Sequence, residues 1–232
     1  MRVSQSQINL YRFCPYAYKL HYLDKCEPMN FKPELFEVGS RVHDAINRYY
    51  EEFYKPSITL PKLQALLYNI LRKDWDYTLP PEFLKKAKQC LDNFSTFEIV
   101  EMVRRDYEKP FSEVAVYDKN LFGIIDYYHP RTSRVIDFKT SVSTSITNDY
   151  KVQASLYLHL VNSMSNRKVE KFYFYFLPAN KLVEVPLDEN LVEEVKIFAQ
   201  KIQLSLKTHD FPKVETRCKS CPYRYYCKIL KL

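Results

Sequence analysis

The stretch Gly123–Thr140 reads GIIDYYHPRTSRVIDFKT and contains the two acids on which the fold prediction depends. Apolar residues surround Asp126 in its first part, and Asp137 follows Val-Ile in its second, so both parts are typical of β-strands, over 121–128 and 135–139. The turn between them carries proline and small polar residues. Strands joined in this way can place Asp126 and Asp137 side by side.

Alternation along the second strand puts Asp137 and Lys139 on one face and Phe138 on the other. Two carboxylates beside an amine can hold a hard divalent cation next to a positive group, which suits water attack on a phosphodiester. An acid and a lysine two residues apart are also common on exposed strands. The apolar residues before Asp137 favour a buried strand, where an unpaired carboxylate is costly and metal binding would remove that cost.

The composition predicts a folded protein with one domain. Of its 232 residues, 46% are hydrophobic and 16% aromatic, which is enough for a sizeable core. The only two glycines, Gly39 and Gly123, cannot build a Walker or Rossmann phosphate loop. The net charge of +7 is compatible with an anionic partner. The sequence starts without a signal-peptide pattern, and no apolar run approaches the roughly 20 residues of a membrane span, so we expect a cytoplasmic protein.

Six cysteines in an intracellular chain favour metal binding or free thiols over disulfides. The C-terminal pattern is C-x2-C-x5-C, formed by Cys218, Cys221 and Cys227. Three clustered thiols need a fourth ligand, and Cys14, which also precedes a proline, is the best candidate for a clip that joins the chain ends. Thiolates at these spacings suit either a tetrahedral zinc or a cubane iron–sulfur cluster. Cys26 and Cys90 are predicted to be buried thiols.

Periodicity and turn signals predict an α/β fold with a helical insertion. The expected helices are a short one that starts at a Ser4–Gln7 capping box and ends near Cys14, then 33–54, 60–105 with a break at Pro80-Pro81, 149–162 and 191–206. The expected strands are 111–117, 121–128, 134–140, 171–177 and 182–185. We expect one domain over 1–232, divided into an N-terminal helix (1–30), a helical region (33–108), a core (110–186) and a cysteine-containing C-terminal part (187–232).

Four further polar positions are candidates for the same site. His43 flanks the apolar stripe of its helix, and Glu113 lies at the start of the first core strand. Gln153 and Tyr157 are four residues apart, so they share one helix face and can point into one cleft. Each of these residues alone is also compatible with an ordinary surface position.

Taken together, these residues resemble the RecB-type nucleases of the PD-(D/E)XK superfamily. The match is best to the CRISPR-associated exonucleases that carry a four-cysteine iron–sulfur cluster; AddB and helicase-linked nuclease domains resemble the chain more distantly. The resemblance covers nearly the whole chain, through seven motifs in the family's order. These are Ser4–Pro15 with its Cys-Pro, GSRVH ending at His43, Glu113, GIID ending at Asp126, DFKT starting at Asp137, the Gln153/Tyr157 pair and the three C-terminal cysteines.

The resemblance implies a restriction-endonuclease-like core, with a mixed central sheet flanked by helices, and a role for each motif. The implied ligands of Mg²⁺ or Mn²⁺ are His43 through Nε2, Asp126, Asp137 and the backbone carbonyl of Phe138. Lys139 would position or deprotonate the attacking water, and the second role needs a lowered pKa. Glu113 would support this site or a second metal, Gln153 and Tyr157 would hold the DNA backbone, and Cys14, Cys218, Cys221 and Cys227 would hold a 4Fe-4S cluster as a structural staple.

The implied function is that of a metal-dependent deoxyribonuclease. It would act as an exonuclease, with endonuclease activity as a further option, on single-stranded or frayed DNA. The expected setting is CRISPR spacer acquisition, with CRISPR integration proteins as partners, or DNA processing by a mobile element. The alternative is a non-catalytic iron–sulfur DNA-binding module with the same fold. The presence of Asp126, Asp137 and Lys139 together favours the enzyme.

Overall fold

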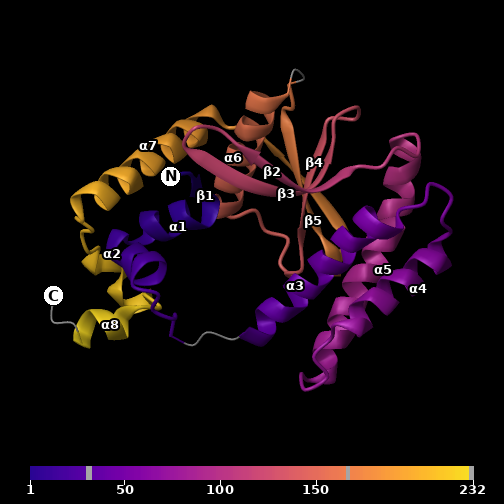
Figure 1. Ribbon diagram of the computed structural model, residues 1–232, viewed down its shortest axis with the longest axis horizontal. Helices are drawn as coiled ribbons and strands as arrows, with labels where there is room; N and C mark the ends of the chain where they lie inside the picture. Colours follow the sequence, from indigo (N-terminus) through magenta and orange to yellow (C-terminus); the bar gives the residue numbers. More distant parts are fainter. Residues whose placement is uncertain (30–32, 166–167, 230–232) are drawn as a thin grey trace.

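The structure is a computed structural model that describes residues 1–29, 33–165 and 168–229. It is an α/β fold in which helices flank a mixed six-stranded sheet, as the sequence predicted (Figure 1). The strands are β1 (Val3–Ser4), β2 (Phe111–Tyr117), β3 (Leu121–His129), β4 (Arg134–Lys139), β5 (Lys171–Phe176) and β6 (Lys181–Pro186). The α-helices are α1 (Gln5–Phe13), α2 (Pro15–Tyr18), α3 (Pro33–Arg48), α4 (Leu60–Lys73), α5 (Pro81–Arg104), α6 (Asn148–Met164), α7 (Glu189–Thr208) and α8 (Arg224–Ile229).

The sheet follows the order β1-β3-β4-β5-β6, and β2 pairs with β3. β3 is antiparallel to β2 and β4, and β5 is antiparallel to β6. β4 and β5 are parallel, so the chain must cross over between them, and α6 makes that crossing. This connection brings α6 against the sheet near the end of β4, where the candidate acids lie.

Two hydrophobic clusters form the core. Phe172, Phe174 and Phe176 of β5 belong to one cluster, together with residues of α1, α6 and α7. Tyr175 of β5 belongs to the other, which is built largely from α3, α4 and α5. Because strand side chains alternate between faces, the aromatic run in β5 serves both layers at once. Figure 1 shows α3, α4 and α5 gathered on one side of the strands and α1 and α7 on the other.

Most predicted elements are confirmed, with differences of a few residues at their ends. Ser4 caps α1 with the predicted capping box, since its side chain accepts from the Gln7 N–H and the Gln7 side chain accepts from the Ser4 N–H. The predicted helix 33–54 consists of α3 followed by a π-helical turn, Tyr49–Phe53. The region 60–105 divides into α4 and α5 around the predicted break. The pairing of Val3 with Leu121 in β1 was not predicted.

A buried ion pair anchors the helical layer to the sheet. Glu98 and Arg105, at the end of α5, are almost fully buried and contact each other through both guanidinium branches. Tyr50 donates to Glu98 at 2.6 Å, and Arg105 donates to the hydroxyl of Tyr127 at 3.3 Å. Removing one partner would leave a buried charge unpaired, so this network holds the layer firmly against Tyr127. Tyr127 is the neighbour of Asp126 in β3.

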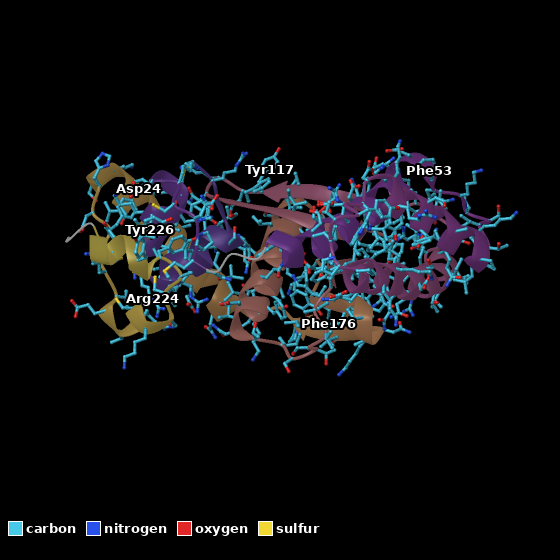
Figure 2. All side chains as sticks on the ribbon, turned by 90° about the horizontal axis from the view of Figure 1, so that it is seen from below. Asp24, Phe53, Tyr117, Phe176, Arg224 and Tyr226 are labelled. Atoms are coloured by element: carbon cyan, nitrogen blue, oxygen red, sulfur yellow. The ribbon has the colours of Figure 1, made fainter. Side chains whose placement is uncertain are left out.

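The N-terminal segment that contains His21 and Met29 lies against the C-terminal segment around Pro222, at one end of the molecule. Tyr223 and His21 share a hydrogen bond of 2.8 Å, and the Met29 N–H donates to the Pro222 carbonyl at 2.7 Å. Figure 2 shows Asp24, Arg224 and Tyr226 at this end, opposite Phe53. The structure thus places Cys14 and the C-terminal cysteines in one region. Within the described ranges, every helix is too short or too polar to span a bilayer.

Candidate metal site and cysteine cavity

The strands β3 and β4 separate where the two acids lie. Their paired register ends at Tyr127 and Ile136, one residue before Asp126 and Asp137 meet. The backbone N–H of Phe138 donates instead to Oδ2 of Asp126, at 2.7 Å. The two acids therefore lie close together where the regular pairing of β3 and β4 ends, and a side chain replaces the next backbone partner.

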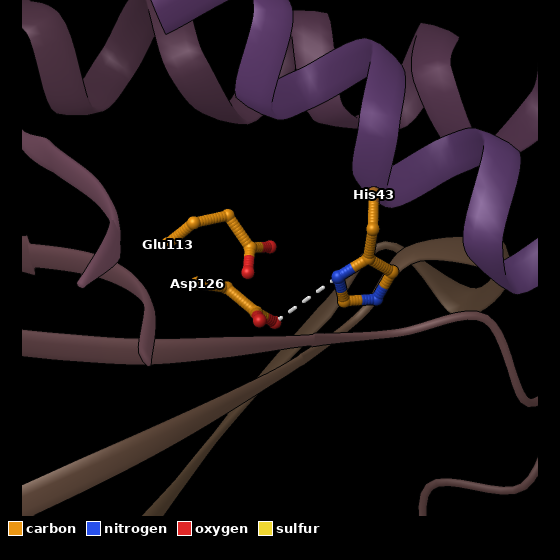
Figure 3. Close-up of side chains that lie close together, drawn as sticks. All are labelled: His43, Glu113 and Asp126. Atoms are coloured by element: carbon orange, nitrogen blue, oxygen red, sulfur yellow. Dashed lines mark ion pairs between the residues drawn. The ribbon is translucent and has the colours of Figure 1, made fainter. Parts of the chain in front are cut away.

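Three side chains from different elements converge where this pairing ends. His43 comes from α3, Glu113 from β2 and Asp126 from β3, and one ligand atom from each lies within 4.8 Å of the other two (Figure 3). The ring nitrogen of His43 that faces Asp126 is Nδ1, 3.5 Å from Oδ2. One imidazole and two carboxylates are a donor set suited to Mn²⁺ or Mg²⁺.

The backbone at Glu113 has an unusual conformation. Its φ is 49°, in the left-handed region that non-glycine residues enter at a cost of about 1 kcal/mol or more. Its neighbours Ser112 and Val114 pair with Tyr127 and Ile125, so Glu113 lies across from Asp126. Strained residues of this kind cluster at functional sites. Here the strain accompanies a carboxylate that faces His43 and Asp126.

Asp137 and Lys139 form a second group beside the first, bridged by a glutamine. Lys139 Nζ lies 2.6 Å from Oδ1 of Asp137 and donates to Oε1 of Gln153 at 3.1 Å. Gln153 Nε2 donates in turn to Oδ2 of Asp137 at 2.7 Å. Although Oδ1 of Asp137 is in ionic contact with Lys139, it is buried without a well-aligned hydrogen bond. A cation that took this oxygen as a ligand would take the place of its ionic contact with Lys139.

The electrostatics of the cluster reflect three carboxylates and two cations in a small volume. Burial lowers the pKa of His43, but Asp126, with help from Asp137 and Glu113, raises it to about 9. Burial, together with the charge of Asp126, raises the pKa of Glu113. Burial also raises the pKa of Asp137, against the opposing effect of Lys139. A divalent cation would relieve the repulsion between these acids, and it would have to displace the proton of His43.

The pKa of Lys139 differs from the expectation. Burial lowers it, as the sequence argument required, but the charges of Asp137 and Asp126 outweigh burial and raise the pKa above its usual value. The side chain is therefore an ammonium group in this arrangement. This state suits a donor to phosphate oxygens and does not suit a base.

The two glycines of the sequence explain how α6 and α3 approach the strands. A Cβ atom on Gly123 would lie 2.5 Å from Cε1 of Tyr157, so only glycine lets the buried Tyr157 ring rest on β3. A Cβ on Gly39 would lie 3.4 Å from Oγ1 of Thr140, which is an ordinary contact. Gln153 and Tyr157 lie on one face of α6, as predicted. The Gln153 side chain contacts Asp137, and the Tyr157 ring lies against Gly123.

We predict that Gly123→Ala destabilises the protein by about 1–3 kcal/mol, because the new methyl group must displace the Tyr157 ring within a packed core. Gly39→Ala is the matched control, since its new methyl group would make only an ordinary contact with Thr140. It also replaces a glycine inside α3, a change that stabilises a helix by up to about 1 kcal/mol. Urea unfolding of both variants measures the difference. Equal stability of the two variants would contradict the close packing at Gly123.

The four predicted cluster cysteines line one cavity. Cys14, Cys218, Cys221 and Cys227 surround a volume of about 560 Å³. Cys221 is buried, and this burial raises the pKa of its thiol most. The nearby Cys14 and Cys218 raise this pKa further, whereas the hydrogen bond from the Tyr223 N–H lowers it. Cys90 is buried in the helical layer, as predicted, whereas Cys26 is partly exposed.

The spacing of these thiols bears on the choice between zinc and a cluster. A tetrahedral zinc with bonds of about 2.3 Å would hold its four sulfur atoms about 3.8 Å apart. Among the described residues, only His43, Glu113 and Asp126 are close enough together to share one ion, and no set of cysteines meets that condition. In a cubane, by contrast, each thiolate binds a different iron atom, so the thiolates lie further apart than they do around one zinc ion.

One feature of the site was not anticipated from the sequence. Glu113 belongs to the tight set with His43 and Asp126, whereas Asp137, predicted as a direct ligand, lies outside that set and is held by Lys139 and Gln153. A single acid in an alternating strand carries no signal of a positive φ, so its position could not be predicted.

Another unanticipated contact links α3 to β2. Ser112 Oγ donates to Oδ1 of Asn47 at 2.9 Å, one helical turn after His43 and one residue before Glu113. This hydrogen bond ties together the two elements that carry two of the three converging side chains.

Comparison with known proteins identifies the family. A family model described as the PD-(D/E)XK nuclease superfamily matches residues 2–228. A solved structure titled "Crystal structure of SSO0001" aligns with 86% of this chain and 98% of its own, at 18% sequence identity and a TM-score of 0.37. No curated protein matches the chain.

Proposed function

Because the chain belongs to the PD-(D/E)XK nuclease superfamily, we propose that it is a divalent-metal-dependent nuclease that cleaves single-stranded or frayed DNA. The observation that carries this proposal is the convergence of His43, Glu113 and Asp126 beside the Asp137–Lys139 pair. A site that only bound DNA would have no need for three mutually repelling carboxylates, since these repel phosphate as well.

The side chains divide the work between holding the cation and handling the phosphate. His43, Glu113 and Asp126 would bind the ion, and Asp137 would complete its shell through the oxygen that lacks a hydrogen bond. The bound ion supplies Lewis acidity, which favours deprotonation of water and neutralises charge on the scissile phosphate. The Phe138 N–H orients Asp126, and we assign the Phe138 carbonyl as a further ligand. Gln153 holds Asp137 and Lys139 in place, and its side chain contacts that of Tyr157 on the same helix face.

Lys139 would stabilise the negative charge that builds on the phosphate oxygens as water attacks. We therefore expect Lys139→Ala to lower the rate of single-turnover cleavage by about 100-fold or more, while the affinities for DNA and Mn²⁺ stay close to wild type. Lys171→Ala is the control, because Lys171 is an exposed β5 lysine paired with Glu184 at 3.0 Å. Losses of equal size in binding and in rate would make Lys139 a phosphate anchor instead.

We further propose that the cysteine cavity holds a 4Fe-4S cluster through Cys14, Cys218, Cys221 and Cys227. Support comes from the shared cavity and from the finding that, among the described residues, no three of these thiols lie within 4.8 Å of one another. The narrower assignment to CRISPR-associated exonucleases, and a role in spacer acquisition or in a mobile element, rests on the motif resemblance. The single-domain organisation over 1–232 is part of the same proposal.

A cleavage assay with single-stranded DNA tests the proposed function. Purified protein should degrade the DNA with Mn²⁺, stop on addition of EDTA and resume with excess Mn²⁺. DNA binding without cleavage under any of these metal conditions would favour the alternative, a non-catalytic iron–sulfur DNA-binding module.

A further inference from the structure

Two aromatic rings flank the amino group of Lys139. Its Nζ lies 5.0 Å from the ring centroid of Tyr150 and 5.2 Å from that of Phe174. A cation within about 6 Å of a ring centroid is attracted by the negative face of the ring, and the attraction grows when water is excluded. The side chain of Lys139 is only 20% exposed and Phe174 is buried, so these contacts are largely shielded from water.

The start of α6 places Tyr150 at this position. Thr147 caps the helix, and its hydroxyl accepts from the backbone N–H of Tyr150 at 3.3 Å. Tyr150 therefore lies in the first turn, three residues before Gln153, and residues at this spacing share one helix face. The Tyr150 ring packs against Phe174, with ring centroids 4.9 Å apart. Because Phe174 is fully buried, the pair of rings is anchored in the core.

The two rings hold Lys139 without occupying its hydrogen-bond donors. An ammonium group has three N–H donors. One side of Nζ faces Oδ1 of Asp137 at 2.6 Å, and a second N–H donates to Oε1 of Gln153 at 3.1 Å, so a third remains for a phosphate oxygen. A cation that takes Oδ1 of Asp137 as a ligand removes the first of these contacts. The rings carry no net charge, so they can hold the ammonium group both before and after the cation binds.

We propose that Tyr150 is a positioning residue which, together with Phe174, holds the ammonium group of Lys139 so that its free donor meets the scissile phosphate. This inference rests on the proposed nuclease function and adds a residue that acts through Lys139. A fixed ammonium group matters because negative charge on the phosphate oxygens builds up in the transition state. A donor that is already in place then needs no rearrangement.

The test is a double-mutant cycle on single-turnover cleavage of single-stranded DNA, with Mn²⁺ and DNA saturating. Tyr150→Leu removes the ring and should lower the rate by about 10-fold, the size expected for a shielded cation–π contact, while the affinities for Mn²⁺ and DNA stay close to wild type. Tyr150→Phe keeps the ring and should cleave at nearly the wild-type rate. In the Lys139→Ala background, Tyr150→Leu should cause no further loss, because the group that it positions is absent.

Tyr68→Leu is the matched control. Tyr68 of α4 is a partly buried tyrosine in the helical layer, and Arg72 and Lys88 each lie 5.7 Å from its ring centroid. The substitution therefore removes a ring with cations beside it away from the candidate site. It should leave the cleavage rate at the wild-type value.

A wild-type rate for Tyr150→Leu would overturn the inference. Equal losses in Tyr150→Leu and Tyr150→Phe would assign the effect to the hydroxyl group and would also contradict it. A loss in the Lys139→Ala background as large as in wild type would show that Tyr150 only supports the packing around Phe174. Wild-type protein that cleaves no DNA with Mn²⁺ would instead overturn the proposed function, so the two failures are distinguishable.

Discussion

Asp137→Ala should reduce cleavage of single-stranded DNA by about 1,000-fold or more. The cation contributes several kcal/mol of transition-state stabilisation, and each 1.36 kcal/mol is a factor of ten in rate. The carboxylate of Asp137 is buried, contacts Lys139 and carries the oxygen that lacks a hydrogen bond. Its removal takes away a ligand and leaves Lys139 without its main partner. Single-turnover rates with saturating Mn²⁺ measure the effect.

Asp137→Asn separates the chemical role of this residue from its structural one. The amide keeps the shape of the side chain and an oxygen that can accept from Gln153, so we expect a folded protein whose loss of activity is nearly as large. Asp149→Ala is the control, because Asp149 is an exposed acid on α6, the helix that carries Gln153. A rate within threefold of wild type for Asp137→Asn would show that Asp137 does not serve the cation.

Cys14→Ser should lower the iron content as severely as Cys221→Ser does, although the two residues are separated by almost the whole chain. Protein purified without oxygen should be brown and hold about four irons per chain in wild type, as expected for a cubane with four thiolate ligands. Loss of the cluster should also lower the thermal midpoint, since the cluster would join α2 to the segment that ends in α8. Iron analysis and thermal unfolding follow both effects.

Cys90→Ser and Cys26→Ser are the matched controls for the cysteine cavity. Cys90 is buried among the helices of the insertion, and Cys26 does not line the cavity, so both variants should keep full iron content. Colourless protein with one zinc per chain would support a metal link between Cys14 and the C-terminal cysteines but would contradict the iron–sulfur proposal. Full iron content in Cys14→Ser would show that another residue is the fourth ligand.

The elements that the sequence predicted well are those with local signals. The capping box at Ser4 and the paired prolines at 80 and 81 each act over a few residues, and the structure contains both features. β1 could not be predicted in this way, because two residues have no periodicity and their pairing partner in β3 is more than a hundred residues away.

For the candidate site, the structure brings several of the predicted residues together, and the sequence was less informative about their arrangement. The i, i+2 spacing of Asp137 and Lys139 predicted a shared face, and the two side chains are in contact. The place of Glu113 in the set with His43 and Asp126 was not predictable, since it depends on a positive φ that no neighbouring residue signals. The raised pKa of Lys139 was not predictable either, because burial lowers it and the nearby carboxylates raise it. Which effect is larger depends on distances that the sequence does not give.

Titration of the protein with Mn²⁺ in a calorimeter, without DNA, tests the central claim most directly. We predict that wild type binds Mn²⁺ at the acid site and that Asp126→Asn, which changes the carboxylate closest to both His43 and Phe138, weakens binding by at least about 10-fold. Asp149→Asn should bind as wild type does. Equal Mn²⁺ affinity in wild type and Asp126→Asn would contradict a metal site formed by His43, Glu113 and Asp126.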